Sequence, residues 1–390
     1  MLTFRTAGES HGQALIALVE GLPSNVPVDI DFIDNELKRR QGGYGRGGRM
    51  KIEKDRVRIL SGVRHGKTLG SPVAMMIENR DWPNWEETMS VRELSPDVAT
   101  KRTVTRPRPG HTDLAGSLKF NQIDARNILE RSSARETTAR VAAGGLAKVF
   151  LRNFGIEILS HTTAIGSVSV PTDFAVTWDQ LESLRNDDVV RCALPDVGER
   201  MVQEIEKAQK EGDTIGGTFE VIARGVPTGL GSHVAWDTRL DGQLAQAIMS
   251  INAVKGVEVG IGVQGAFRKG SAVHDEIAYD ATAKRFFRLT NRAGGLEGGI
   301  TNGEDVRVTG YLKPIPTLKK ALQSVDMITK EPFVAQHERS DTCTVPAAGV
   351  IGETMVALVL GRVLLEKFGG DSIEETTRNY KAYLEQLRSY

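Results

Sequence analysis

The sequence of 390 residues has few cysteines and no excess of charge of either sign. Only Cys192 and Cys343 are present, about 150 positions apart, which argues against a disulfide-stapled scaffold and a structural zinc site. No metal ligand set is predicted. Lysine plus arginine and aspartate plus glutamate each number 50, so no overall field favours nucleic acid, an anionic membrane or a polyanionic partner.

Long apolar runs and the common nucleotide-binding motifs are also missing. Glu353 and Arg362 interrupt the longest apolar run before it reaches about 18 residues, so no transmembrane helix is expected. Glu9 and His11 fall where a signal peptide would need its apolar part. The absence of GxGxxG after a predicted strand and of GxxxxGK[ST] argues against a Rossmann site and a P-loop. We expect a soluble, cytoplasmic protein.

Three segments have the apolar spacing of helices. The first is Asp31–Arg40, which ends before Gly42 and Gly43. The second begins at Ser133, which forms an S-x-x-E capping box with Glu136, and runs to about Asn153. The third is Ala347–Phe368, which is apolar round most of its circumference and is therefore predicted to be buried.

Six short segments are rich in β-branched residues and bounded by glycine, proline or aspartate, as strands are. They are Val57–Leu60, Val73–Ile77, Ile156–Ile158, Phe219–Ile222, Val257–Val263 and Val306–Val308. Because they do not alternate regularly with helices, the pattern predicts an α+β fold instead of a doubly wound parallel sheet. No linker or repeat divides the chain, so a single domain over residues 1–390 is predicted.

Arginine is concentrated in the N-terminal part of this neutral chain. Residues 1–140 hold 23 basic and 18 acidic side chains. The stretch 39–51, RRQGGYGRGGRMK, sets arginines among glycines. A flexible solvated loop is one alternative; an RNA-binding tail is another, but such tails are long, repetitive and terminal. Glycine-rich backbone carrying guanidinium groups is suited to wrap a small phosphorylated or carboxylated molecule.

Two further arginine groups follow within about 100 residues of the first. Arg106 and Arg108 lie in the stretch 105–111, TRPRPGH, whose prolines favour extended backbone, although a rigid surface loop is an alternative. Arg131 and Arg135 lie at the start of the second predicted helix, where free N–H groups favour an anion. The three groups together predict one site for a polyanionic small molecule.

His11 and His111 are the candidate acid–base residues near these arginines. Ser10 and His11 are neighbours in the run GESHG at 8–12, which by itself is compatible with a polar turn. We reject a hydrolase triad, because an adjacent serine and histidine cannot easily form the required hydrogen bond and GxSxG is absent. Histidine ordinarily titrates near neutrality, so it suits protonation of a departing anion. Ser340 or Asp341 could cap the third helix, and Asp341 could supply a carboxylate to the site as well.

Nine stretches, in order along the chain, resemble the chorismate synthase family. They are AGESHG at 7–12, RRQGGYGRGGRM at 39–50, SGVRHGKTLGSPV at 61–73, RPGH at 108–111, ERSSARETTARVAAG at 130–144, SINAVKGVE at 250–258, GGLEGGITNG at 294–303, KPIPT at 313–317 and ERSD at 338–341. Several are long and unusual, and the resemblance runs in family order from residue 7 to about residue 353.

The resemblance implies a single β-α-β sandwich, with helices between antiparallel sheets, assembled as a homotetramer. It implies the last common step of the shikimate pathway to aromatic amino acids, a carbon–oxygen lyase reaction. In that step 5-enolpyruvylshikimate 3-phosphate loses phosphate and a C6 hydrogen in an anti 1,4-elimination that gives chorismate. The family requires reduced FMN without net redox change. A substrate with a phosphate and two carboxylates needs several arginines, since buried charge must be paired.

The resemblance also carries over site residues by motif. The implied FMN contacts are Arg131, Ser132, Ser133, Asn252, Ala253, Gly298, Lys313, Pro314, Ile315, Pro316, Thr317 and Arg339. Arg40 and Arg46 match positions described for NADPH, a candidate reductant. Substrate-binding residues are predicted to be Ser10, Arg49, Arg108 and Arg135.

Three residues are given chemical roles by the family's proposed mechanism. His11 is expected to donate a proton to the leaving phosphate, His111 to set the protonation of the reduced flavin near N1, and Asp341 to assist proton removal through flavin N5. Thr342 stands where many members have proline, which bears on the rigidity of that loop.

Partners follow from the same resemblance. The chain has no added segment the size of a flavin reductase, so reduced FMN is expected from an external reductase or a reduced flavin pool. No nucleic-acid or membrane partner is expected. A flavin-dependent NADPH oxidoreductase and a nucleic-acid-binding module that uses the glycine-arginine stretch are the rival functions.

Overall fold

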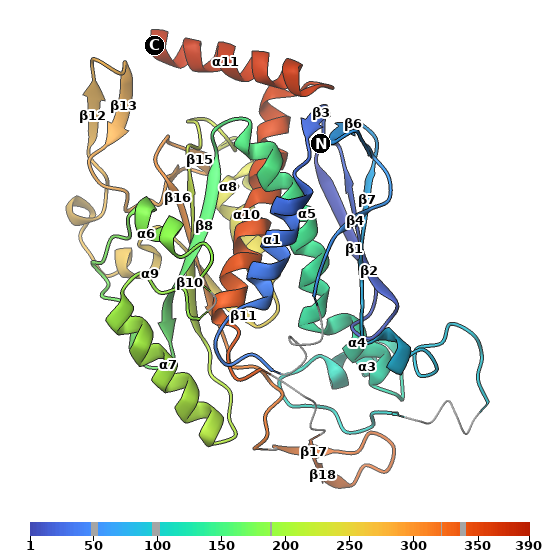
Figure 1. Ribbon diagram of the computed structural model, residues 1–390. Helices are drawn as coiled ribbons and strands as arrows, with labels where there is room; N and C mark the ends of the chain where they lie inside the picture. The colour runs from blue at the N-terminus through green and yellow to red at the C-terminus, as the bar shows by residue number, and fades with distance from the viewer. Residues whose placement is uncertain (48–53, 96–101, 188, 321, 336–340) are drawn as a thin grey trace.

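Two antiparallel sheets enclose a layer of helices in the computed structural model, which describes residues 1–47, 54–95, 102–187, 189–320, 322–335 and 341–390 (Figure 1). One sheet has the order β1-β2-β7-β4, made of β1 (Thr3–Ala7), β2 (Ala14–Glu20), β7 (Val73–Glu78) and β4 (Arg58–Ile59). The other has the order β11-β16-β10-β8-β9, made of β11 (Val254–Val259), β16 (Val306–Leu312), β10 (Gly217–Arg224), β8 (Glu157–Ile165) and β9 (Val168–Ser169). The predicted α+β sandwich is confirmed.

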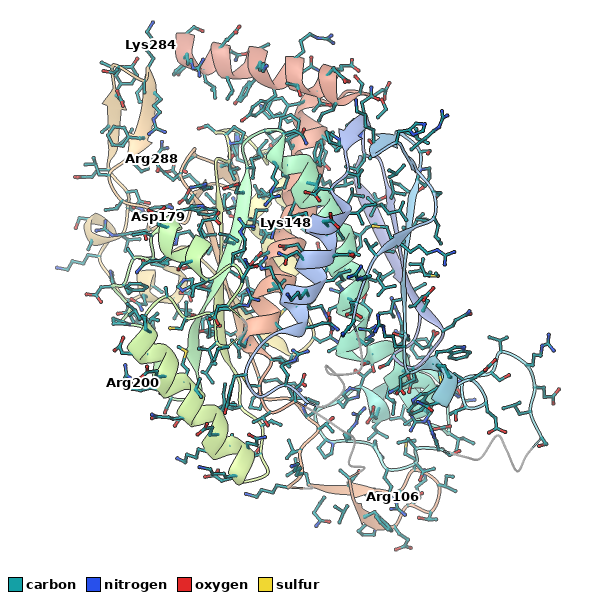
Figure 2. All side chains as sticks on the ribbon, in the orientation of Figure 1. Arg106, Lys148, Asp179, Arg200, Lys284 and Arg288 are labelled. Atoms are coloured by element: carbon teal, nitrogen blue, oxygen red, sulfur yellow. The ribbon has the colours of Figure 1, made fainter. Side chains whose placement is uncertain are left out.

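The helices between the sheets are α1 (Ile30–Gln41), α5 (Thr137–Arg152), α8 (Leu240–Met249) and α10 (Val345–Phe368). The backbones of α5 and α10 approach closely at Gly144, where a Cβ atom would lie 2.2 Å from Cβ of Thr354. Any larger residue at 144 would therefore force the two helices apart. Figure 2 shows Lys148 of α5 inside this layer.

Strand periodicity explains which side of each sheet faces the helices. Leu15, Ala17 and Val19 alternate along β2 and are buried. In contrast, five consecutive residues of β10, Phe219–Ala223, are all buried. The second sheet is covered on its outer side as well: Leu181 of α6 (Trp178–Ser183) packs against the sheet, and α7 (Pro195–Lys210) lies outside it (Figure 1).

The remaining elements lie around the sandwich. They are a three-stranded sheet of β3 (Ser24–Pro27), β6 (Lys67–Leu69) and β5 (Val63–Arg64); the hairpins β12–β13 (Ile277–Asp280, Arg285–Arg288), β14–β15 (Leu296–Glu297, Ile300–Thr301) and β17–β18 (Gln323–Val325, Pro332–Val334); and the helices α3 (Asp113–Phe120), α4 (Arg126–Ser132), α9 (Gly262–Gly265) and α11 (Ile373–Ser389). Short 3₁₀ turns cover Trp82–Asn84, Ala134–Glu136, Trp236–Thr238 and Gly270–Ala272. Figure 2 shows Arg106 beside β17–β18.

The first and third predicted helices are confirmed, as α1 and α10, but the start of the second was wrong. The α-helix begins at Thr137, after a 3₁₀ turn. No capping box forms, because the Ser133 hydroxyl accepts from the N–H of Arg135 and not of Glu136. The Glu136 carboxylate instead accepts from the Thr6 hydroxyl at 2.6 Å and from Arg140 at 2.8 Å.

Each of the six predicted strands corresponds to a strand, although Val257–Val263 was too long. Strand β11 ends at Val259, because Gly260 and Gly262 have φ angles of +59° and +38° that leave the extended region. Helix α10 is long and apolar enough to span a membrane, but 94% of its most apolar window is buried among the protein's own elements. It is the core helix of the sandwich, as in a soluble protein.

Candidate active site

The GESHG run connects β1 to β2, at the end of the first sheet. Gly8 has φ +102° and a Cβ there would lie 2.3 Å from the carbonyl oxygen of Ala14, so the turn requires glycine. Ser10 is buried, and its backbone N–H donates to the carbonyl oxygen of Glu130 at 2.9 Å. The turn is thereby held against α4.

The His11 side chain is fixed by a carboxylate and an aromatic ring. Its Nδ1 lies 2.9 Å from Oε2 of Glu130, whose side chain is 1% exposed. Its ring stacks on Trp85, with centroids 3.8 Å apart. Arg126 donates to Oε1 of Glu130 at 3.0 Å. Burial alone would raise the pKa of Glu130, but the hydrogen bonds from His11 and the charges of His11 and Arg126 lower it.

The 105–111 stretch meets the KPIPT motif. Arg108 is buried and donates to Asp113 at 2.8 Å and to the Thr317 hydroxyl at 2.9 Å. The Nδ1 atom of His111 lies 2.5 Å from the same Asp113 carboxylate. Burial opposes ionisation of Asp113, yet hydrogen bonds from His111 and Arg108 hold its pKa below the ordinary value. His111 is thus tied to a carboxylate that an arginine also pairs, as His11 is.

Arg40 and Arg135 meet at the buried Asp55 carboxylate, where α1 ends and α5 begins. Arg135 donates to both oxygens of Asp55 at 2.7 and 2.8 Å. Nη1 of Arg40 is 3.9 Å from Asp55 and, among the described residues, has no hydrogen-bond partner. Burial lowers the pKa of Arg40 to about 9; the charge of Asp55 and, less strongly, that of Asp341 oppose this, and the charges of Arg135 and Arg46 reinforce it. Two buried guanidinium groups therefore meet at the Asp55 carboxylate.

Asn79 joins this arginine pair to the histidine turn. Its side-chain oxygen accepts from Nε of Arg135 at 3.0 Å, and its amide donates to the carbonyl oxygen of Gly12 at 2.7 Å. One buried amide therefore spans from Arg135 to the residue after His11. The sequence reading missed Asn79, Glu130 and Asp55, because a single buried polar residue has no spacing pattern that reveals its partner.

Arg46 lies where the glycine-rich stretch contacts the segment before α10. Nε of Arg46 is 3.4 Å from Oδ2 of Asp341, and Oδ1 of Asp341 accepts from the N–H of Gly47 at 2.5 Å. The possibility that Asp341 caps α10 was wrong, because Thr344 is the N-cap residue and Asp341 is engaged by the glycine-rich stretch. Two further predicted residues, Arg49 and Arg339, lie outside the described residues, as does Ser340.

Most of the predicted cofactor residues meet at one place. Nδ2 of Asn252 donates to the carbonyl oxygen of Ser132 at 3.1 Å, and the N–H of Lys313 donates to Ala253 at 3.0 Å. The Lys313 ammonium donates to the carbonyl oxygen of Gly110, next to His111, at 2.6 Å. Three segments distant in the sequence, 132–133, 252–253 and 313–317, therefore lie together.

The flanking members of that set are held mainly through backbone groups. Arg131 donates to the carbonyl oxygens of Thr6 and Gly8 at 2.9 and 3.1 Å. The carbonyl oxygen of Ile315 accepts from the Thr214 hydroxyl at 2.7 Å. Ser133, Pro314 and Pro316 connect these positions along the chain.

Gly298 is the exception among the predicted cofactor residues. It lies in the turn between β14 and β15, next to His233. The N–H of Leu240, the first residue of α8, donates to the carbonyl oxygen of the adjacent Gly299, so this turn is close in space to the start of α8. Asn252 lies just beyond the other end of α8, and a helix of ten residues spans roughly 15 Å. The structure does not bring Gly298 to the other cofactor positions of the same chain.

Comparisons with known proteins agree with the fold. The family described as chorismate synthase matches residues 2–365. The chain is 56% identical over 392 residues to "Chorismate synthase" of Solibacter usitatus and 55% identical over 397 residues to that of Acidobacterium capsulatum, with 100% of each chain covered. A solved structure titled "Crystal Structure of Chorismate Synthase" matches with a TM-score of 0.80 and 42% identity, covering 100% of this chain and 99% of that one. The chain therefore belongs to the chorismate synthase family.

Proposed function

We propose that the protein converts 5-enolpyruvylshikimate 3-phosphate to chorismate by anti 1,4-elimination of phosphate and a C6 proton, as a carbon–oxygen lyase that needs reduced FMN without net redox change. The observation that carries this proposal is the buried guanidinium of Arg40, whose Nη1 has no hydrogen-bond partner among the described residues and lies 3.9 Å from Asp55, a carboxylate that Arg135 already engages. A buried guanidinium N–H without a partner calls for a ligand acceptor, and an anion suits it best. A substrate with a phosphate and two carboxylates supplies it.

The remaining substrate contacts are proposed from the residues around this pair. Ser10 is next to His11 in the chain, and Arg108 contacts His111. Arg49 is assigned by its motif alone. Arg40 and Arg46 were assigned to NADPH by resemblance. Because Arg40 shares Asp55 with Arg135, we assign Arg40 to the same anion site instead.

The residues around Lys313 suit FMN. Oδ1 of Asn252 is buried and has no hydrogen-bond partner among the described residues, so it can accept from a ligand N–H or O–H. Lys313 brings a cation, and Thr317 a hydroxyl, to the same place. When bound, reduced FMN would supply electron density to the electron-poor allylic system left by C–O cleavage.

Proton handling falls to this chain's own side chains. His11 holds a proton for the leaving phosphate, while His111, tied to Asp113, holds one beside the cofactor residues. Asp341 is the carboxylate proposed to assist removal of the C6 proton. The arginines orient the substrate between these groups.

The test is anaerobic incubation of the protein with 5-enolpyruvylshikimate 3-phosphate and chemically reduced FMN, with chorismate and phosphate measured. Chorismate and phosphate should form in equal amounts with reduced FMN, and neither should form with oxidised FMN. Absence of product with reduced FMN would overturn the proposal. Steady NADPH oxidation without the phosphorylated substrate would favour the rival oxidoreductase, and salt-sensitive RNA binding the nucleic-acid module.

Three further properties are proposed from the family alone: homotetrameric assembly, a cytoplasmic location, and reduced FMN supplied by an external reductase or flavin pool. Light scattering after gel filtration tests the assembly state. NADPH tests the reductant: if it acts only through an external reductase, NADPH with FMN should support turnover only after that reductase is added.

A further inference from the structure

The Glu130 carboxylate contacts both the backbone N–H and the ring of His11. Its Oε2 accepts from the backbone N–H of His11 at 2.9 Å, and its two oxygens lie 3.0 and 2.9 Å from Nδ1 of the ring. Arg126, one turn earlier in α4, donates to Oε1 at 3.0 Å. Backbone and ring of the same histidine are thus held by one buried side chain.

The charge state of Glu130 decides which ring nitrogen carries hydrogen. The pKa of Glu130 lies below its ordinary value, because hydrogen bonds from His11 and the charges of His11 and Arg126 outweigh burial. An ionised carboxylate only accepts hydrogen bonds, so Nδ1 of His11 must be the donor. In the neutral ring Nε2 then carries no hydrogen, and it is the nitrogen at which a proton can be exchanged with a ligand.

Trp85 fixes the plane of the ring. The two rings are 24° from parallel with centroids 3.8 Å apart. Trp85 is itself anchored, since its Nε1 donates to Asp81 at 3.0 Å and the guanidinium of Arg102 lies 4.1 Å from its ring centroid. A flat, anchored surface prevents the imidazole from turning about its long axis.

We propose that Glu130 and Trp85 are positioning residues that hold His11 as the Nδ1–H tautomer, so that a proton is exchanged with the substrate only at Nε2. This inference rests on the proposed role of His11 as proton donor to the leaving phosphate. Its geometry can be tested without turnover.

The chain contains a matched control. Nε2 of His161 lies 3.0 Å from Glu220, which also accepts from Arg307 at 2.8 Å, so the same three residue types meet in β8, β10 and β16. His161 is 2% exposed and lies in the sheet. Loss of the Glu220 charge should therefore leave His11 and turnover unchanged.

The first measurement is the nitrogen-15 NMR spectrum of histidine-labelled protein. Wild type and Glu220→Gln should show His11 as the Nδ1–H tautomer when neutral. Glu130→Gln should raise the Nε2–H population, because the glutamine amide can donate to Nδ1. An unchanged His11 tautomer in Glu130→Gln would overturn the inference, whatever the enzyme's activity.

The second measurement is turnover. Glu130→Gln should lower kcat about 10²-fold with KM changed less than about threefold, since orientation and not binding is lost. Glu130→Asp, which keeps the charge, should restore part of kcat and guards against a folding defect. If Glu130→Gln alters the tautomer while His11→Ala keeps full turnover, the proposed function of His11 fails and the positioning geometry stands.

Trp85 is tested by a pair of substitutions. Trp85→Phe retains a stacking face and should keep kcat within about threefold, whereas Trp85→Leu should lower it about tenfold with little change in KM. Equal kcat values for the two variants would remove Trp85 from the proposal.

Discussion

Arg39 and Arg40 are neighbours in α1 and both are buried, yet their surroundings differ. Arg39 donates to Glu36 at 2.7 Å and to Glu353 at 2.8 Å, and Lys148 pairs with the same two carboxylates. Two cations thus face two anions. Burial would lower the pKa of Arg39, but the two glutamates raise it above its ordinary value.

Arg40 has no such balance. Its guanidinium donates to the Thr137 hydroxyl and to the carbonyl oxygen of Ala134, and it shares Asp55 with Arg135. A buried cluster whose charges cancel serves the structure, whereas a buried guanidinium N–H without a hydrogen-bond partner, as Nη1 of Arg40 is among the described residues, suits a ligand acceptor. Of the two adjacent arginines, Arg39 therefore has a structural role and Arg40 is assigned to the ligand site.

The largest expected effect is on the balanced cluster. Glu353→Gln leaves Arg39 and Lys148 with one carboxylate fewer in a site that solvent does not reach, so the free energy of unfolding should fall by about 3–5 kcal/mol. Urea denaturation at pH 7 measures it. Glu366→Gln on the same helix, which breaks a partly exposed pair with Arg362, should cost less than about 1 kcal/mol. Equal losses would mean that charge balance is not what distinguishes the cluster.

Arg40→Met should impair substrate binding while leaving the stability of the fold nearly unchanged, the opposite of Glu353→Gln. Because Arg135 still pairs Asp55 when Arg40 is removed, the free energy of unfolding should stay within about 1 kcal/mol of wild type, or rise. Loss of a buried charged contact to the substrate should lower kcat/KM about 10²–10³-fold. Steady-state kinetics and urea denaturation of the same preparation measure both. A strongly destabilised variant with normal kcat/KM would assign Arg40 to the structural cluster instead.

Acid should weaken the balanced cluster through Glu353. Burial opposes its ionisation, but Arg39 and Lys148 hold its folded-state pKa below the ordinary value near 4.5. Its contribution to stability is therefore complete above about pH 4.5 and is lost as the pH falls below that value, by up to about 1.4 kcal/mol per pH unit. The stability gap between wild type and Glu353→Gln should narrow from pH 5 to pH 3. A constant gap would contradict the ionised state of Glu353.

The sequence predicted the fold best where one periodic pattern spans an element. The buried helix α10 and strands such as β7 were visible because their apolar residues face the core, and α1 because a glycine pair ends it. Helices α7, α8 and α11 were not predicted, although each is a regular helix with buried positions. Boundaries set by distant partners were also missed, as at Glu136, which contacts Thr6 of another element.

The sequence predicted which residue types form the candidate site but not which of them contact one another. Arginine groups and histidines are visible as clusters, and motif resemblance supplied roles. The surroundings of the two adjacent arginines depend on Asp55 and Glu353, which are 298 positions apart in the chain, and only folding brings them to Arg40 and Arg39. The carboxylate that orients His11, Glu130, is likewise 119 positions away in the chain, whereas Asp113 is only two residues from His111 and was overlooked although it is local.

The smallest expected effect tests anion binding at Arg40 directly. If the unpartnered Nη1 of Arg40 takes an anion, inorganic sulfate should bind there and raise the melting temperature. At ten times its dissociation constant it should add about 1.4 kcal/mol, roughly 1–3 °C for a chain of this size. Sulfate also stabilises proteins through exclusion from their surface, so the informative quantity is the difference between wild type and Arg40→Met at the same sulfate concentration, with sodium chloride at matched ionic strength as reference. The shift should be larger in wild type. Identical shifts would show that sulfate acts only on bulk solvation and that Arg40 does not bind an anion.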